Sequence, residues 1–252
     1  ELEQQARQLR QMGAKRVLDE IELRHEAGQY SLVTRLLTNF PTEEVSGETL
    51  QRVREMIGQY EGAQARVKRL GQQLQATAGQ IADTDQRELI APVVKEIVTD
   101  LTQGTVDRMV PFDQLYDDDS LTAEQKVALG ISGWLLGGNN AKQDFAAAVS
   151  LITIRQGVLK YLREPMAHQR LALLESIGSM KGASVDNVAE LIAHLAPPWE
   201  VPPQDGGKFD ALELSAEGRT EHGNFRYLVQ LPPEYDRYRH YPMLVDINGT
   251  HN

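Results

Sequence analysis

The chain has 252 residues, of which 41% are apolar and 25% are charged, and its formal net charge is −10. This composition is typical of a soluble globular protein, and because no region is basic we expect no nucleic-acid-binding surface. The chain has no cysteine, which excludes disulfides, thiolate zinc sites and a cysteine nucleophile. No apolar run approaches the ~20 residues that a membrane-spanning helix needs. The sequence does not choose between a cytoplasmic and a periplasmic location, and it leaves both native termini undetermined.

The first part of the chain, residues 1–75, is predicted to be helical. Apolar residues at helical spacing around Ile21 predict a first helix, which Gly28 interrupts. A second helix ends at Pro41, and a third begins at about Ser46. The first two helices are similar to one tetratricopeptide pair, but the second is about one turn too short and no ~34-residue period recurs. A plain helical hairpin is therefore favoured over a repeat.

A second helical domain is predicted over residues 76–196. Two capping boxes mark helix starts in it, and they are Asp85-x-x-Glu88 and Thr122-x-x-Gln125. The first precedes a helix over residues 89–101, in which a proline at position 92 falls in the opening turns. The second opens a helix that ends near position 136, and residues 109–121 between the two are predicted to be a loop.

Three more helices are predicted before residue 196. They cover residues 142–162, residues 167–177 and a last segment capped by Ser184. In the second of these, Leu171, Leu174 and Ile177 share one face. In the last, the predicted buried stripe consists of Val188, Leu191, Ile192 and Leu195.

The clearest boundary in the sequence is a Pro/Gly linker over residues 197–207, because paired prolines exclude helix. After the linker the apolar period changes from that of a helix to two. Strands are predicted over residues 209–215 and 225–231, joined by a glycine-flanked connection that suits an antiparallel hairpin. A third strand is predicted over residues 243–247, a short and mainly apolar run, as expected of a strand buried on both faces and parallel to a neighbour.

Residues 208–252 resemble the start of the α/β-hydrolase fold, in the branch of prolyl-oligopeptidase-like and esterase-like serine hydrolases. The resemblance is carried by the motif L-P-x-x-Y-D at residues 231–236 and by a Y-P-x-L-V-x-x-H-G-like segment at residues 241–249, in which Asn248 replaces the histidine. It covers under a fifth of the chain. It implies a mainly α fold class: a helical N-terminal region followed by the first strands of an α/β-hydrolase-type sheet, with three strands of a truncated catalytic domain over residues 208–252.

The same resemblance implies a candidate site at the end of the chain. The loop after the third strand of such enzymes supplies a backbone N–H to the oxyanion hole. By position, Gly249 and Thr250 match that loop, and the replacement at Asn248 puts the identity of the donor in doubt. The alternative interpretation is an Asn-Gly turn at the end of a strand.

The sequence predicts no catalytic residue in this chain. It contains no G-x-S-x-G motif, since Ser132 and Ser179 stand between glycines at the wrong spacing. In the fold that the sequence resembles, the order is serine, then acid, then histidine, all after the third strand. His251 lies before any such serine, so we do not expect it to be the base.

No metal or cofactor site is predicted either. Residues 117–119 and Asp113 are acidic, but they lack the alternating spacing, the glycine and the closing glutamate of a calcium loop, so a solvated loop before a helix is favoured. No histidine pair has the H-x-x-x-H spacing of a zinc site. The histidines are His25, His168, His194, His222, His240 and His251.

The resemblance predicts that the complete protein is a serine hydrolase whose substrate is a small-molecule ester or a peptide. This chain would then supply a helical region and the start of the catalytic domain, without the nucleophile. The alternative is a non-catalytic helical interaction module whose helical region binds a protein partner. A G-x-S-x-G motif in the sequence that follows would separate the two hypotheses.

Overall fold

The computed structural model describes residues 1–198, 212–216 and 225–246. The chain is mainly helical, with 69% of its residues in helix. In chain order, the described elements are α1 (Leu2–Glu26), α2 (Tyr30–Thr38), α3 (Gly47–Gly79), α4 (Thr84–Asp100), η1 (Val106–Met109), α5 (Val110–Leu115), α6 (Ala123–Leu136), η2 (Gly138–Asn140), α7 (Phe145–Arg163), α8 (Ala167–Ser179), α9 (Val185–Ala193), β1 (Leu212–Ala216) and β2 (Phe225–Val229).

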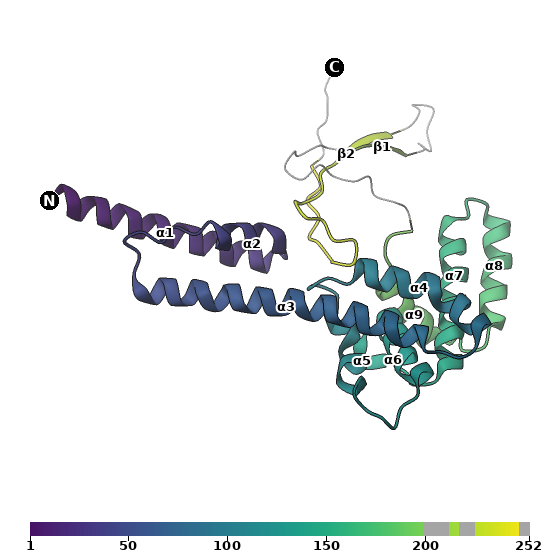
Figure 1. Cartoon of the computed structure of the whole chain (residues 1–252). Helices are drawn as coiled ribbons and strands as arrows, with labels where there is room; N and C mark the ends of the chain where they lie inside the picture. The colour runs from purple at the N-terminus through teal and green to yellow at the C-terminus, as the bar shows by residue number, and fades with distance from the viewer. Residues whose placement is uncertain (199–211, 217–224, 247–252) are drawn as a thin grey trace, which may run out of the picture.

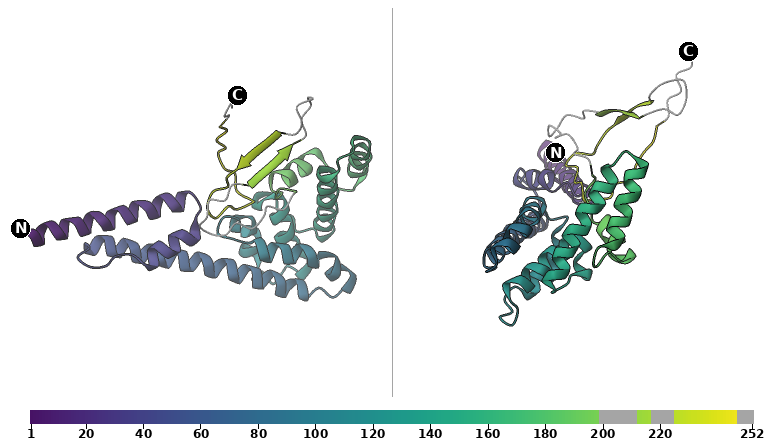
Figure 2. Two further views of the ribbon diagram at one scale, coloured as in Figure 1. Left: turned by 90° about the horizontal axis from the view of Figure 1, so that it is seen from above. Right: turned by 90° about the vertical axis from the view of Figure 1, so that its right-hand side faces the viewer.

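The long helix α3 is the spine of the molecule. At 33 residues it extends for about 50 Å, and it runs unbroken across position 75. Its first half packs with α1 and α2, and its second half packs with α4 and α6, so that two cores lie at opposite ends of one helix (Figures 1 and 2). The smaller core is formed by Ala14, Leu18, Ile21, Val33, Leu37, Phe40, Val53 and Tyr60.

The larger core is built around α6. Every residue from Val127 to Leu136 in this helix is buried, and α3, α4, α5, α7 and α9 pack around it. The neighbouring helix α7 is, among the described helices, the one long and apolar enough by length and composition to cross a membrane. It buries Leu151, Ile154 and Val158 in this core, and 33% of its apolar window is buried.

Local sequence signals fix several helix ends as predicted. Ser46 and Ser184 accept hydrogen bonds from the third following backbone N–H, and the capping box of Thr122 and Gln125 is complete. The cap predicted at Asp85 is wrong. The carboxylate of Asp83 accepts from the Gln86 N–H instead, so α4 begins earlier than expected.

Two proline positions also differ from the prediction. Pro92 is the ninth residue of α4 rather than part of an opening turn, so it removes one hydrogen bond from the helix interior. The predicted loop over residues 109–121 contains helix α5, in which Pro111 occupies the second position. Proline is tolerated there because the first N–H groups of a helix have no partner within it. Phe112 is fully buried and pulls this short helix onto the core.

The predicted faces of α8 and α9 are partly wrong. In α8, Ile177 is buried as predicted and Leu173 is half-buried, whereas Leu171 and Leu174 are 63% and 54% exposed. In α9, Leu191 is buried but Ile192 is 51% exposed. Both helices lie on the surface and touch the core along a narrower stripe than the sequence suggests.

The two strands pair as predicted. β1 and β2 are antiparallel, with Leu212 opposite Val229 and Ala216 opposite Phe225. Residues 243–246 form no strand in this chain, and a third strand in the sheet of a complete domain stays a prediction. Met243, Leu244 and Val245 are 85%, 95% and 64% exposed. A strand needs a neighbour for its backbone groups, and the described β1 and β2 pair with each other.

The close approach of α6 to the backbone before it gives a first prediction. A Cβ added at Gly133 would lie 2.5 Å from the Arg108 carbonyl oxygen, a contact that no side-chain movement relieves. We expect Gly133→Ala to lower the free energy of unfolding by more than about 2 kcal/mol. The matched control is Gly62→Ala, where nothing lies within 4 Å and where alanine stabilises a helix by up to about 1 kcal/mol. Urea unfolding of the two variants should differ in sign, and equal effects would contradict this packing.

The smaller core gives a prediction about pH. Burial, and next the neighbouring Tyr30, raise the pKa of Tyr60 to about 12, and its hydroxyl is bonded to the Nδ1 atom of His25. The folded state favours the neutral phenol. The contribution of Tyr60 to the free energy of unfolding is therefore fully present below pH 10 and is lost as the pH rises from 10 through 12. Urea unfolding over this pH range should show that the free energy of unfolding falls less in Tyr60→Phe than in the wild type. The exposed Tyr227→Phe should behave like the wild type; an identical loss in all three would contradict the assignment.

Candidate functional site

The residues that the sequence singled out do not form an active site in the described part of the chain. Gly249 and Thr250 lie outside the described residues, as do Asn248 and His251. Ser132 is buried, and its Oγ donates to the Ala128 carbonyl at 2.6 Å and accepts from the Lys142 N–H at 2.7 Å. This serine is therefore a structural link between α6 and the segment before α7, with no base beside it.

The acidic residues near position 117 have structural partners. Asp113 accepts from Arg66 and Arg69, each at 2.9 Å, and so ties α5 to α3. Asp118 accepts from the hydroxyl and the N–H of Ser120, and these hydrogen bonds lower the pKa of its carboxyl. Across residues 1–198, 212–216 and 225–246, no group of three or more metal-ligating side chains could hold an ion.

The densest set of polar contacts lies elsewhere, where residues 232–241 cross the helices. We name this segment the strap. It has internal order: the Asp236 carboxylate accepts from the Tyr238 N–H at 2.9 Å, the Tyr241 hydroxyl accepts from the Asp236 N–H at 2.9 Å, and the rings of Tyr235 and Tyr241 stack at 5.3 Å. The strap follows β2 and passes close to the helices near the N-terminal end of α2 and beside α4 (Figure 1).

One part of the strap completes the corner between α1 and α2. The Glu234 carboxylate accepts from the N–H groups of Ser31 and Leu32 at 2.8 and 2.6 Å. The N-cap residue of α2, Gln29, makes no side-chain cap of its own. The carboxylate of Glu234, some 200 positions away, therefore accepts the hydrogen bonds of the first free N–H groups of this helix. Arg239 donates to the carbonyl of Glu26, the last residue of α1, at 2.6 Å.

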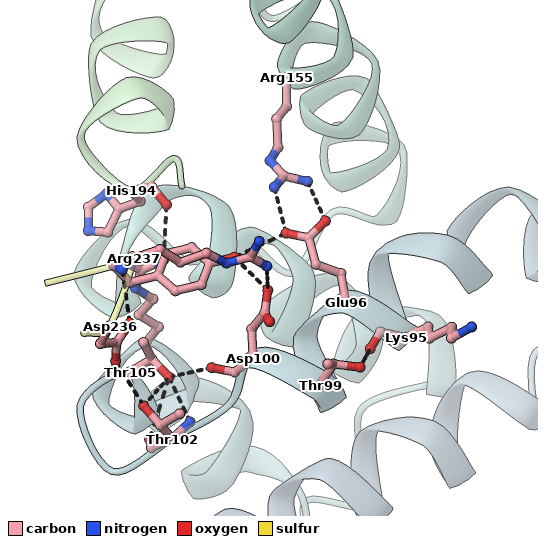
Figure 3. A network of polar contacts seen from close by, with 12 residues as sticks. Lys95, Glu96, Thr99, Asp100, Thr102, Thr105, Arg155, His194, Asp236 and Arg237 are labelled. Atoms are coloured by element: carbon pink, nitrogen blue, oxygen red, sulfur yellow. Dashed lines mark hydrogen bonds and ion pairs between the residues drawn. The ribbon is translucent and has the colours of Figure 1, made fainter. Parts of the chain in front are cut away.

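The other part of the strap binds the C-terminal end of α4. Arg237 forms an ion pair with Asp100, and the Tyr238 hydroxyl donates to Asp100 at 2.8 Å and lies 3.3 Å from Glu96. Glu96 in turn accepts hydrogen bonds from the two terminal guanidinium nitrogens of Arg155 on α7, Nη1 and Nη2, at 2.8 and 2.5 Å. Figure 3 shows these carboxylates between the arginine of α7 and the arginine of the strap.

The ring of Tyr238 is the anchor of the strap. It meets the buried ring of Trp134 edge to face at 5.2 Å. The guanidinium of Arg108 lies 4.8 Å from the Tyr238 ring centre and 5.0 Å from that of Trp134, and it donates to the His194 carbonyl at 3.1 Å.

Burial governs the charge states at this anchor. It lowers the pKa of the Arg108 guanidinium, with the nearby Tyr238 and Asp236 opposing the shift. It also raises the pKa of the Tyr238 hydroxyl, and the hydrogen bond to Asp100 raises it further. The phenol therefore stays neutral and remains a donor to the carboxylate.

A cavity of about 560 Å³ lies between the strap and α2, α3 and α4. Its lining mixes aromatic, polar and charged side chains, among them Tyr30, Gln64, Val67, Lys68, Asp100 and Tyr235. The acids in the lining are engaged, since Asp100 and Glu234 hold the contacts described above. The Thr102 hydroxyl donates to the Asp236 carboxylate at 3.4 Å and accepts from the Gly104 N–H at 3.2 Å, so it takes part in the turn after α4.

No family model, curated protein or solved structure matches the chain. The site itself consists of ion pairs, helix-end contacts and an aromatic anchor, which is the chemistry of a recognition surface. Sequence reasoning identified residues 231–236 as a connecting loop but missed that this segment docks. The signal was present, because three tyrosines and two arginines fall within residues 235–241, and these residue types are enriched at the centres of interfaces.

The contact at α2 gives a prediction for the strap. Removing the acid by Glu234→Ala should leave the N–H groups of Ser31 and Leu32 without acceptors, and capping of this kind stabilises a helix end by about 1 kcal/mol. We expect about fivefold faster amide hydrogen exchange at these two residues. Glu234→Gln keeps one acceptor oxygen and should give a smaller effect. Unchanged exchange at both residues in Glu234→Ala would show that the contact does not hold the helix end.

Proposed function

We propose that this chain is the helical region and the first strands of a serine hydrolase of α/β-hydrolase type, acting on an ester or peptide bond. In this proposal the complete protein supplies the nucleophile, the acid and the base from residues that follow Asn252. The oxyanion loop would include Gly249 and Thr250. The substrate would be a small-molecule ester or a peptide.

The observation that carries the proposal is the exposed apolar segment after the strap. Leu244 is 95% exposed and Met243 is 85% exposed, although mainly apolar segments of this kind, here interrupted at Asp246, are typical of strands buried on both faces. The segment follows an antiparallel pair, β1 and β2, and a proline-containing loop. That order of elements is the one expected for the start of a hydrolase sheet, in which further strands would cover these side chains.

The strap is compatible with this proposal, because it fixes where the segment begins. Tyr241, the last residue of the strap, is joined to Asp236 and stacked on Tyr235. Residues 243–246 therefore start from a held position beside the helices, and added strands would be built outward from there.

The alternative is a helical interaction module without chemistry. It is favoured by one observation, that the described residues hold a well-formed recognition surface and no nucleophile with a base beside it. In this alternative the exposed segment at residues 243–246 would be covered by a partner protein rather than by further strands of the same domain.

A fluorophosphonate probe tests the proposal, because it reacts with an activated serine nucleophile. We expect the 252-residue chain to remain unlabelled and to be inert toward activated esters. The complete gene product should be labelled at a serine beyond Asn252. Replacing that serine with alanine should abolish labelling and leave the helical content by circular dichroism unchanged.

The two hypotheses give opposite results in this experiment. A complete gene product that takes no label would favour the interaction module. Stoichiometric labelling of the short chain would mean that the nucleophile lies within residues 1–252, and mapping the labelled serine by mass spectrometry would locate it.

A further inference from the structure

We propose that the helical region, residues 1–198, is a receptor that binds the strap as a peptide ligand. The ligand is an extended segment with an acid, an arginine, an anchoring tyrosine and a second arginine at fixed spacing: Glu234, Arg237, Tyr238 and Arg239. Binding holds the strand-bearing part on the helices without needing the chain connection between them. This inference does not rest on the proposed hydrolase activity.

The strap carries the attachment in the described part of the chain. Strap residues make hydrogen bonds and ion pairs with α1, α2, α4 and the turn after α4. The two strands bond to each other instead. The strap therefore differs from β1 and β2 in its contacts, because it contacts the helices whereas the two strands pair with each other.

The receptor surface offers a complementary group to three of the charged side chains of the strap. The N-terminus of α2, where backbone N–H groups and the helix dipole favour an anion, receives Glu234. The C-terminal carbonyl of α1, which favours a cation, receives Arg239. The carboxylate of Asp100 at the end of α4 receives Arg237. The ends of three helices therefore bind three charged side chains of the ligand.

The anchoring tyrosine enters a preformed aromatic and cationic setting. Trp134 is 1% exposed and belongs to the larger core, and Arg108 is fixed by the carbonyls of His194 and Trp134. A rigid pocket that accepts one aromatic side chain, with charged contacts around it, is the usual arrangement of a binding hot spot.

The ligand is also partly organised before it binds. Within the strap, the Asp236 carboxylate accepts from the Tyr238 N–H, the Asp236 N–H donates to the Tyr241 hydroxyl, and the ring of Tyr235 stacks on that of Tyr241. Preorganisation of this kind lowers the entropy lost on binding. The strap can therefore act as a ligand of defined shape rather than as a flexible tail.

Cleavage of the linker in the intact protein tests the proposal. A site for a sequence-specific protease is inserted between Asp205 and Gly206, which lie outside the described residues, and the purified full chain is cut. We expect the two pieces to sediment together at the mass of the uncut chain in analytical ultracentrifugation. Separate sedimentation of the pieces at micromolar concentration would overturn the proposal.

Variants on the strap then test which side chain the receptor reads. Tyr238→Ala should raise the dissociation constant of the cut protein, measured by dilution, about 30-fold or more, as expected for a hot-spot residue. Tyr238→Phe keeps the ring and loses the hydroxyl, and should weaken binding less. The matched control is Leu244→Ser, in the same piece but outside the strap and 95% exposed, which should bind like the wild type. Equal dissociation constants for Tyr238→Ala and the wild type would overturn the assignment of the anchor.

Discussion

The guanidinium of Arg108 is the point on which the arrangement of the chain depends. It lies in η1, donates to the carbonyls of Trp134 in α6 and of His194 at the end of α9, and lies 5.0 and 4.8 Å from the ring centres of Trp134 and Tyr238. Moving a cation out of water is costly unless hydrogen bonds and neighbouring charges offset the cost. Because these partners come from α6, the end of α9 and the strap, those three segments have to meet η1 for the charge to be tolerated, and this specifies the arrangement more strongly than apolar packing alone.

The two helical cores are joined by elements of very different kind. Helix α3 links them covalently and mechanically, whereas the strap links them by side-chain contacts at the ends of α1, α2 and α4. The strap therefore matters most at the α1–α2 corner, which has few apolar contacts with the larger core. Loss of the strap would leave the N-terminus of α2 uncapped, and local opening would begin there before the larger core unfolds.

The sequence predicted what depends on near neighbours. Helical period located most helices, and the caps at Ser46, Thr122 and Ser184 follow from oxygen-bearing side chains at fixed spacing. The predictions were wrong where contacts with distant parts of the chain determine the local structure or the buried face. Phe112 makes α5 a helix by entering the core, and α8 turns a different row inward because only α7 lies beneath it. The role of Tyr238 could not be derived from periodicity, since its partners lie more than 40 positions away on three helices.

Recognition by the strap and the proposed hydrolysis are connected through chain length. Seven residues lie between Tyr241 and Gly249, so covalent geometry limits the separation of their Cα atoms to about 27 Å. In the proposed hydrolase, an oxyanion loop at Gly249 would therefore remain within about 27 Å of the last residue of the strap, whatever strands were added beyond it. The contacts that hold the strap on the helices would thus also limit how far such a loop could lie from the helical region.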